Sequence, residues 1–222
     1  KKNKADTDAS KNYKSTEKRY FGSHTSYTLD HDPKHILFSL ARYKFAAKML
    51  AGLETVLEVG CGDGLGANLV AQVCPRVVGI DCDEHAIKNH VETRWVGENI
   101  KLVTHDMVKT PYPEKFDAIY SLDVIEHIEP SLEDKFFRNI ISSSKSNGVL
   151  IMGAPNKTAA PYASPGSESA HINLKDHDEF KLTLSKYYKH VFMFGMNDEV
   201  LHTGFPSMCH YLLALAVDPL EP

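Results

Sequence analysis

Short apolar runs alternate with segments of helical periodicity along most of the chain, and glycine, proline and acidic residues separate them. The runs are rich in β-branched and aliphatic residues, which favour buried strands. They predict strands at 55–59, 76–81, 100–104, 116–122 and 149–152. Strands that alternate with helices are typical of an open α/β sheet with helices on both faces.

Helical patterns link these strands. The pair Asp32-Pro33 is typical of a helix start, and apolar positions follow it with a helical period as far as Leu50. Within that helix, Arg42 is either a surface cation or a partner for a ligand carboxylate. A helix over 65–73 is expected on a stripe of Leu65, Leu69, Val70 and Val73, and later helices are expected after residue 83, after residue 131 and over 176–188. The segments 191–196 and 211–217 are expected to be strands with no long helix between them.

Length and composition fit one globular domain with a sizeable core. The chain has 222 residues, of which 42% are hydrophobic. No apolar run approaches the ~18 residues of a membrane span, and no signal peptide is visible. A net charge of −4 and an isoelectric point of about 6.3 do not suggest a nucleic-acid partner. The four cysteines form no C-x-x-C pair, so we expect free thiols and a cytoplasmic location.

The polar N-terminal region, 1–31, is expected to precede a single domain over 32–222. Residues 1–19 carry many lysines and are typical of a solvated tail. The following segment, 20–31, contains Tyr20, Phe21, His24 and Tyr27, which is unusual for a linker. Two alternatives stay open for it: a lid over the ligand site, or a hydrophobic strap on the core.

A glycine turn follows the strand at 55–59. It has the sequence Glu58-Val59-Gly60-Cys61-Gly62-Asp63-Gly64 and comes just before a helical pattern. Glycine allows a ligand to approach the backbone closely, and a helix N-terminus offers free amide donors. Asp81 ends the next strand, 21 positions after Gly60, which suits an acid that binds ribose hydroxyls. This geometry fits both dinucleotide enzymes and S-adenosylmethionine enzymes.

The segment from Glu58 to Gly64 resembles motif I of the class I S-adenosylmethionine-dependent methyltransferases. The resemblance continues through 78–81, 104–107 and 116–128 and covers roughly 42–217. It implies a Rossmann-like, seven-stranded, mostly parallel sheet with an antiparallel final strand pair. It also implies S-adenosyl-L-methionine as cofactor and S-adenosyl-L-homocysteine as product.

The same resemblance implies roles for acids at the strand ends. Asp81 would bind the ribose, Asp106 would accept from the adenine amine, and Met107 would pack on the ring. Asp123 could face the methionine end. Glu58 is either a structural acceptor or a contact of the cofactor amine. The expected cofactor-binding residues are Glu58, Gly60, Cys61, Gly62, Asp81, Cys82, Asp106, Met107, Leu122 and Asp123.

A hydroxyl acceptor requires a general base, and histidine titrates near working pH. His127 and His171 are the best-placed candidates, because they end the loops after the fourth and fifth strands. His202 and His210 are second choices. No metal site is expected, since the four cysteines lack the C-x-x-C spacing of a dedicated site.

The function expected from these patterns is O-methylation of a small molecule. The segments 20–31, 154–171 and 196–210 are rich in Tyr, His, Asn and Ser, which favours a sugar or sugar nucleotide as acceptor. Alternatives within the class are an N-methyltransferase and a quinol-type O-methyltransferase. A nicotinamide-dependent dehydrogenase lacks support, because there is no Tyr-x-x-x-Lys pair and the turn departs from G-x-G-x-x-G. A non-catalytic cofactor-binding module is the third possibility. No nucleic acid is expected as partner, and the oligomeric state stays open.

Overall fold

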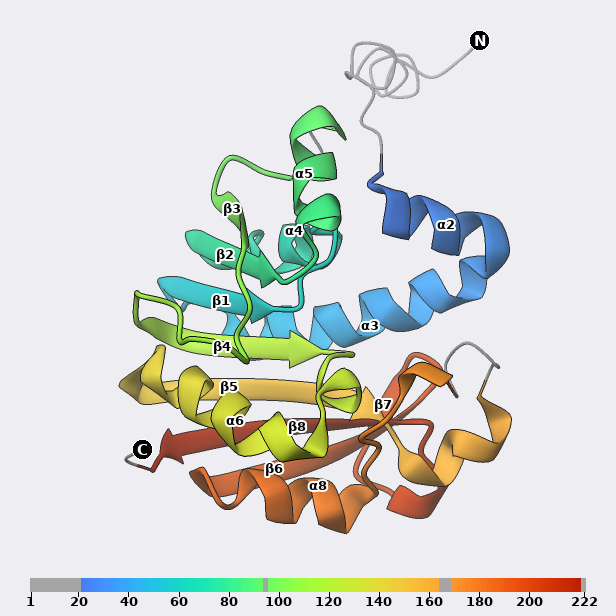
Figure 1. Cartoon of the computed structure of the whole chain (residues 1–222). Helices are drawn as coiled ribbons and strands as arrows, with labels where there is room; N and C mark the ends of the chain where they lie inside the picture. The colour runs from blue at the N-terminus through green and yellow to red at the C-terminus, as the bar shows by residue number, and fades with distance from the viewer. Residues whose placement is uncertain (1–20, 94–95, 164–168, 221–222) are drawn as a thin grey trace, which may run out of the picture.

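The computed structural model describes residues 21–93, 96–163 and 169–220, and its centre is one twisted sheet of eight strands (Figure 1). The strand order is β3-β2-β1-β4-β5-β8-β6-β7. Strands β1 to β5 pair in parallel, whereas β8 runs antiparallel to β5 and β6, and β7 is antiparallel to β6. The strands are β1 (Thr55–Val59), β2 (Arg76–Asp81), β3 (Ile100–Thr104), β4 (Phe116–Leu122), β5 (Ser144–Pro155), β6 (Tyr188–Asn197), β7 (Val200–His202) and β8 (Tyr211–Pro219).

The Rossmann-like fold with an antiparallel end is therefore confirmed, with eight strands in place of seven. The additional strand is β7, which forms a hairpin with β6. The chain reverses there at Asp198, whose φ of 50° lies in the left-handed region that Asp tolerates better than most residues. Because β7 has only three residues, its apolar pattern was too short to be recognised in the sequence.

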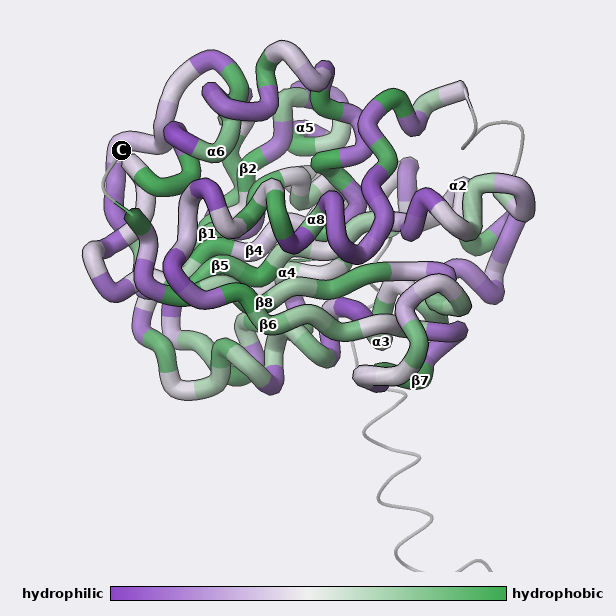
Figure 2. Tube along the Cα trace, turned by 90° about the horizontal axis from the view of Figure 1, so that it is seen from below, coloured by the Kyte–Doolittle hydropathy of each residue, from purple (hydrophilic) through white to green (hydrophobic). Residues whose placement is uncertain are grey.

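Helices cover both faces of the sheet, as expected for an α/β fold. The helical elements are α2 (Ser23–His31), α3 (Pro33–Leu50), α4 (Ala67–Val70), α5 (Glu84–Thr93), α6 (Glu133–Ser142), α8 (His177–Leu184), η1 (Ile125–His127), η2 (Pro130–Leu132), η3 (Lys157–Tyr162) and η4 (Pro206–Met208). One core lies between the sheet and α6 with α8, and a second lies between the sheet and α3 with α4. Successive residues of β1 show why two cores form, since Val56 enters one and Leu57 enters the other. The central strands are correspondingly apolar in Figure 2.

The helix after the glycine turn is shorter than the sequence pattern suggested. Only Ala67–Val70 is α-helical, and of the expected apolar stripe only Val70 is buried, while Val73 is exposed. Gly66 just before the helix is packed under Tyr43, where a Cβ would lie 1.9 Å from the ring. Pro75 follows five residues after the helix ends, and proline cannot donate a helical hydrogen bond, so the helix cannot continue into β2.

Several element boundaries also differ from the sequence expectation. Strand β5 begins at Ser144, earlier than predicted, and its register with β4 shifts between Phe116 and Ala118. Helix α8 ends at Leu184, because the chain already enters β6 at Tyr188. At the start of α3, the side chain of Asp32 makes no capping hydrogen bond.

The structure also bears on the predictions about the cysteines, membrane spans and the N-terminal region. All four cysteines are free thiols, as expected. Among the described helices, none has the length and apolar character needed to cross a bilayer. The expected tail, 1–19, lies outside the described residues. The division into an N-terminal region and a domain over 32–222 stays a prediction.

Candidate functional site

The glycine turn joins β1 to α4 in a conformation that favours glycine. Gly60, Gly62 and Gly64 have φ values of 81°, 52° and 83°. At Gly60 a Cβ would lie 2.1 Å from Cγ2 of Val124, so the position has no room for a side chain. At Gly62 a Cβ would meet nothing within 4 Å, so the backbone there faces open space. A ligand can therefore approach the turn directly at Gly62.

Asp81 lies beside this turn, at the carboxyl end of β2. Its Oδ2 accepts a hydrogen bond from the Gly62 amide at 2.8 Å, and its Oδ1 accepts from the Asp83 amide at 2.9 Å. Each carboxylate oxygen can accept more than one hydrogen bond. The carboxylate is therefore fixed by the backbone while it keeps acceptor capacity for a ligand hydroxyl.

Asp106 and Met107 follow β3 on the same edge of the sheet. Oδ1 of Asp106 accepts from the Val108 amide at 2.9 Å, and Oδ2 lies 3.1 Å from Nζ of Lys109. Partial burial raises the pKa of Asp106, but these partners outweigh it and lower the pKa below its usual value. Met107 is buried and belongs to the core between the sheet and α6. Asp106 is thus a fixed, ionised acceptor beside an apolar surface.

Glu58 lies beneath the turn. Its side chain is buried, and Oε2 accepts a hydrogen bond from the Tyr120 hydroxyl at 2.8 Å. Burial raises the pKa of Glu58 to about 8, although hydrogen bonds from Tyr120 and Tyr43 oppose the shift. The geometry supports the structural alternative for Glu58, because this residue does not line the cavity described next.

A cavity of about 1180 Å³ lies at the carboxyl ends of the parallel strands. It is lined by every residue predicted for the site except Glu58, namely Gly60, Cys61, Gly62, Asp81, Cys82, Asp106, Met107, Leu122, Asp123, His127 and His171. Gly62, Asp81 and Asp106 follow β1, β2 and β3, and we call this part of the wall the glycine half. His127 follows β4, on the other side of β1 in the sheet, and we call the part with His127 and His171 the histidine half. The volume exceeds the ~300–1,000 Å³ of a pocket for one drug-sized ligand, so two reactants can fit together.

The two second-choice histidines, His202 and His210, differ in their position relative to the cavity. His210 lines the cavity. His202 does not, and its Nε2 is 2.7 Å from Oδ1 of Asn197. His202 therefore has a structural role in the β6–β7 hairpin.

Arg42 and Asp123 form an ion pair at the cavity wall. One guanidinium nitrogen of Arg42 donates to both oxygens of Asp123 at 2.8 Å, and the guanidinium lies 3.8 Å from the centre of the Tyr211 ring. The surface alternative for Arg42 is wrong, because only 10% of its side chain is exposed. Asp123 has a φ of 59°, which turns the chain sharply at the end of β4. The charge of Asp123 is thus compensated within the protein.

His127 and His171 come together in the histidine half. Their ring centres are 5.1 Å apart with an angle of 66° between the planes. Nδ1 of His127 lies 3.0 Å from the carbonyl oxygen of Ala170. Since a carbonyl only accepts, Nδ1 carries the proton, so Nε2 is the ring nitrogen that can offer a lone pair. Burial, and then the charge of His127, lowers the pKa of His171, which favours its neutral form.

Glu126 is a residue of this half that the sequence analysis missed. It is fully buried, and neither carboxylate oxygen has a hydrogen-bond partner among the described residues. Burial and the nearby charge of Asp123 raise its pKa well above the usual value. Its backbone oxygen accepts from the amides of Ile172 and Asn173 at 2.9 and 3.0 Å, which holds the His171 segment beside η1. Its position next to His127 was the only signal in the sequence.

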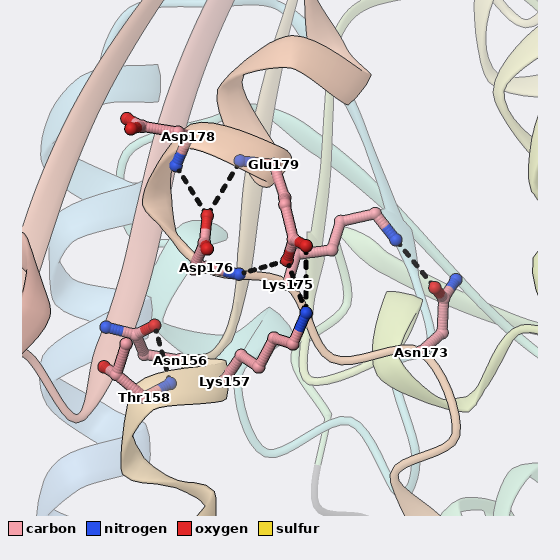
Figure 3. A network of polar contacts seen from close by, with 8 residues as sticks. All are labelled: Asn156, Lys157, Thr158, Asn173, Lys175, Asp176, Asp178 and Glu179. Carbon is pink, nitrogen blue, oxygen red and sulfur yellow. Dashed lines mark hydrogen bonds and ion pairs between the residues drawn. The ribbon is translucent and has the colours of Figure 1, made fainter.

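A polar network fixes the chain between His171 and α8 (Figure 3). Asp176 and Glu179 form a reciprocal capping box at the start of α8. Lys157 of η3 donates to Glu179 at 2.9 Å, and Lys175 donates to Asn173 at 2.7 Å. Lys175 also pairs with Glu133 at 2.6 Å, and both side chains are nearly buried. The histidine half is therefore held in place, although it follows an irregular stretch of chain.

Helix α2 covers one side of the cavity. The carboxylate of Asp63 accepts from the amide and the hydroxyl of Thr25, each at 2.8 Å, which ties α2 to the glycine turn. Ser23, His24 and Tyr27 line the cavity, while Tyr27 is 63% exposed. These positions favour the lid alternative over a hydrophobic strap, whose aromatic side chains would be buried.

Comparison with known protein sequences finds methyltransferases. Residues 57–152 match the family model described as "Methyltransferase domain". A "Probable S-adenosylmethionine-dependent methyltransferase" of Mycobacterium tuberculosis is 31% identical over 115 residues, which are 51% of this chain and 39% of the relative. A mitochondrial ubiquinone biosynthesis O-methyltransferase of Arabidopsis thaliana is 30% identical over 123 residues, which are 54% of this chain and 37% of the relative. The matched stretch thus spans less than half the length of these relatives.

A solved structure shares the fold. The N-methyltransferase NodS of Bradyrhizobium japonicum, crystallised with S-adenosyl-L-homocysteine, superposes with a TM-score of 0.60. The match covers 87% of this chain and 92% of that chain, at 18% identity. At this level of identity the similarity concerns the fold alone.

Proposed function

This chain belongs to the class I S-adenosylmethionine-dependent methyltransferases, and we propose that it methylates a hydroxyl group of a small-molecule acceptor. One observation carries the proposal. One cavity is lined by a glycine turn with two fixed carboxylates, which follow β1, β2 and β3, and by a histidine pair on the side of β4 in the sheet. A donor in the glycine half and an acceptor in the histidine half would share this cavity.

The glycine half fits S-adenosyl-L-methionine. Gly62 leaves the space above the turn open, and Asp81 keeps acceptor capacity for ribose hydroxyls. Asp106 would accept from the adenine amine, with Met107 beside the ring. When bound, the cofactor supplies an electrophilic methyl group on a positively charged sulfur. The carboxylates of this half favour a cationic ligand over the neutral product.

The residues of the histidine half would orient and activate the acceptor. Orientation removes much of the barrier of a displacement reaction, because the reacting atoms are held close and in line. The lone pair on Nε2 of His127 can take a proton from an acceptor hydroxyl or bind a cation. The Arg42–Asp123 pair adds a fixed ion pair to the wall of the cavity.

Two classes of acceptor fit the cavity, and a different observation favours each. Polar side chains of the wall, such as His171 and His210, favour an acceptor with several hydroxyls, such as a sugar or sugar nucleotide. The relatives that act in ubiquinone biosynthesis favour a second candidate, a quinol-type hydroxyl. The Ala159, Ala160 and Tyr162 side of the cavity offers an apolar surface for such a ring.

Binding and turnover measurements test the proposal. Calorimetry should show binding of S-adenosyl-L-methionine and of its demethylated product, with no binding of nicotinamide dinucleotides. A panel of sugar nucleotides and quinols, followed by mass spectrometry, should show addition of one methyl group to oxygen. Absence of cofactor binding would overturn the proposal. Cofactor binding with methylation of amines only would overturn its oxygen specificity.

A further inference from the structure

We propose that Glu126, His127 and His171 form a binding site for a divalent transition-metal ion. One ligand atom from each side chain can be chosen so that all three lie within 4.8 Å of one another. Within the described ranges, this is the one group of three such side chains that meets this condition. The three residues line the histidine half of the cavity, so an ion there would be open to a second ligand.

Glu126 supplies the first independent argument. A buried carboxylate without a hydrogen-bond partner is costly, because the charge loses its hydration and gains nothing in return. The two oxygens of Glu126 have no such partner in the described part of the chain, and the residue is fully buried. A cation held between Glu126 and the histidines would compensate this loss.

The orientation of His127 supplies the second argument. Histidines that bind metals almost always donate the proton of their other nitrogen to a carbonyl or a carboxylate, which fixes the ring. Nδ1 of His127 makes this bond to the Ala170 carbonyl oxygen at 3.0 Å. With the proton on Nδ1, Nε2 is the ring nitrogen that can offer a lone pair to an ion.

The backbone provides the third argument, because it holds both ligand segments in one place. His171 is 44 positions after His127, but the amides of Ile172 and Asn173 bond to the carbonyl oxygen of Glu126. The network in Figure 3 then fixes the chain that follows. The site is therefore formed before an ion arrives.

The ligand types indicate which ions fit. Two imidazoles and one carboxylate suit Zn²⁺, Mn²⁺, Co²⁺ or Fe²⁺ better than Ca²⁺ or Mg²⁺, which prefer oxygen ligands. Three protein ligands leave at least one coordination position open. If the proposed function holds, an acceptor hydroxyl in that position would lose its proton more easily, because a bound cation stabilises the oxyanion. His127 and His171 would then act as ligands and not as bases.

Metal titration of the purified chain tests the site itself. After treatment with a chelator, the protein should bind about one equivalent of Mn²⁺ or Zn²⁺ in calorimetry, without cofactor or acceptor. Co²⁺ should produce a visible absorption band of a protein-bound ion. Glu126→Gln and His171→Ala should each weaken binding by more than the ~10–100-fold typical of losing an outer hydrogen-bond partner of a metal ligand. His210→Ala is the matched control, since His210 lines the same cavity outside the cluster.

The outcomes separate this inference from the proposed function. Binding of S-adenosyl-L-methionine by the metal-free protein tests the glycine half, and metal binding without cofactor tests the histidine half. Unchanged metal affinity in His171→Ala, or no binding by the parent protein, would overturn the metal site and leave the histidines as candidate bases. If Glu126→Gln does not fold, His171→Ala still decides, because His171 is only partly buried.

Discussion

The two halves of the cavity are built in different ways. The glycine half is local: the turn at Gly60–Gly64 and Asp81 belong to one β-α-β unit, and backbone amides hold the carboxylate. The histidine half is assembled from distant segments, with Glu126 and His127 after β4 and His171 before α8. A short motif can encode the first arrangement. The second exists only once β5, η3 and α8 are in place.

The halves also differ in how their charges are satisfied. Asp81 accepts two backbone hydrogen bonds, and Asp106 has a backbone and a lysine partner. Glu126 in the histidine half has none for its carboxylate within the described residues. A satisfied carboxylate is ready to receive a ligand hydroxyl, whereas an unsatisfied one requires a ligand that brings positive charge or a proton. The difference fits the proposed cofactor in the glycine half and the proposed cation in the histidine half.

The largest expected effect concerns turnover and the histidine half. His127→Ala removes the lone pair that either takes the acceptor proton or binds the ion, so turnover should fall by roughly 10²–10⁴-fold. Affinity for S-adenosyl-L-methionine should stay near that of the parent, because His127 is in the other half. Single-turnover rates and calorimetry measure the two quantities separately. Comparable losses of rate and cofactor affinity would show that the halves are not independent.

The sequence predicted the glycine half well, for a physical reason. The turn, Asp81, Asp106 and Met107 each follow a strand whose apolar run is visible, and the carboxyl ends of parallel strands share one edge. The same local pattern could not reveal that Glu58 would lie under the turn. Burial of Glu58 depends on Tyr43 and Tyr120, which come from α3 and β4.

The parts that the sequence did not predict depend on tertiary contacts. Arg42 is on an amphipathic helix, but its pairing with Asp123 needs the sharp turn at the end of β4. The grouping of Glu126 with the two histidines needs the backbone bonds from Ile172 and Asn173. Metal-ligand spacing along the chain is a poor guide in such a case, because one of the ligands is on another segment.

The next largest expected effect concerns Glu58 and the change of the free energy of unfolding with pH. Its pKa is about 8 in the folded protein and about 4.5 when exposed. Between these values the unfolded chain loses its proton while the folded chain keeps it, so stability falls as pH rises through this window. The loss should be at most about 1.4 kcal/mol per pH unit. Glu58→Gln should remove this slope, because glutamine does not titrate and can still accept from Tyr120.

Denaturant unfolding of both proteins at pH 5, 6, 7 and 8 measures that difference. The free energy of unfolding of the parent should decline relative to the glutamine variant over this range and level off above it. Equal slopes in the two proteins would show that Glu58 is ionised in the folded state. The glycine turn would then rest on a buried charge and not on a neutral acid.

Asp81 gives a smaller effect, confined to the glycine half. Asp81→Ala should weaken binding of S-adenosyl-L-methionine by ~1.5–3 kcal/mol, the value typical of hydrogen bonds to a charged group. Metal affinity should not change. Glu84→Ala is a suitable control, because Glu84 is an exposed acid outside the cavity lining that pairs with Lys88 at 2.7 Å. Equal cofactor affinity in Asp81→Ala and the parent would refute the ribose assignment.

The smallest effect concerns the lid and its attachment to the glycine half. Helix α2 buries a single residue, Thr25, and bonds through it to Asp63. Asp63→Ala removes both acceptors, so local opening of α2 should become easier by about 1–1.5 kcal/mol. Amide hydrogen exchange in Ser23–His31 should then be roughly tenfold faster, while exchange in β1 and β4 stays the same. Asp63→Asn is the matched control, because its amide oxygen can accept from the Thr25 amide and its nitrogen can donate to the hydroxyl. If Asp63→Ala exchanges like Asp63→Asn, packing and not the Asp63 bonds holds α2 over the cavity, and closure of the site does not depend on the glycine turn.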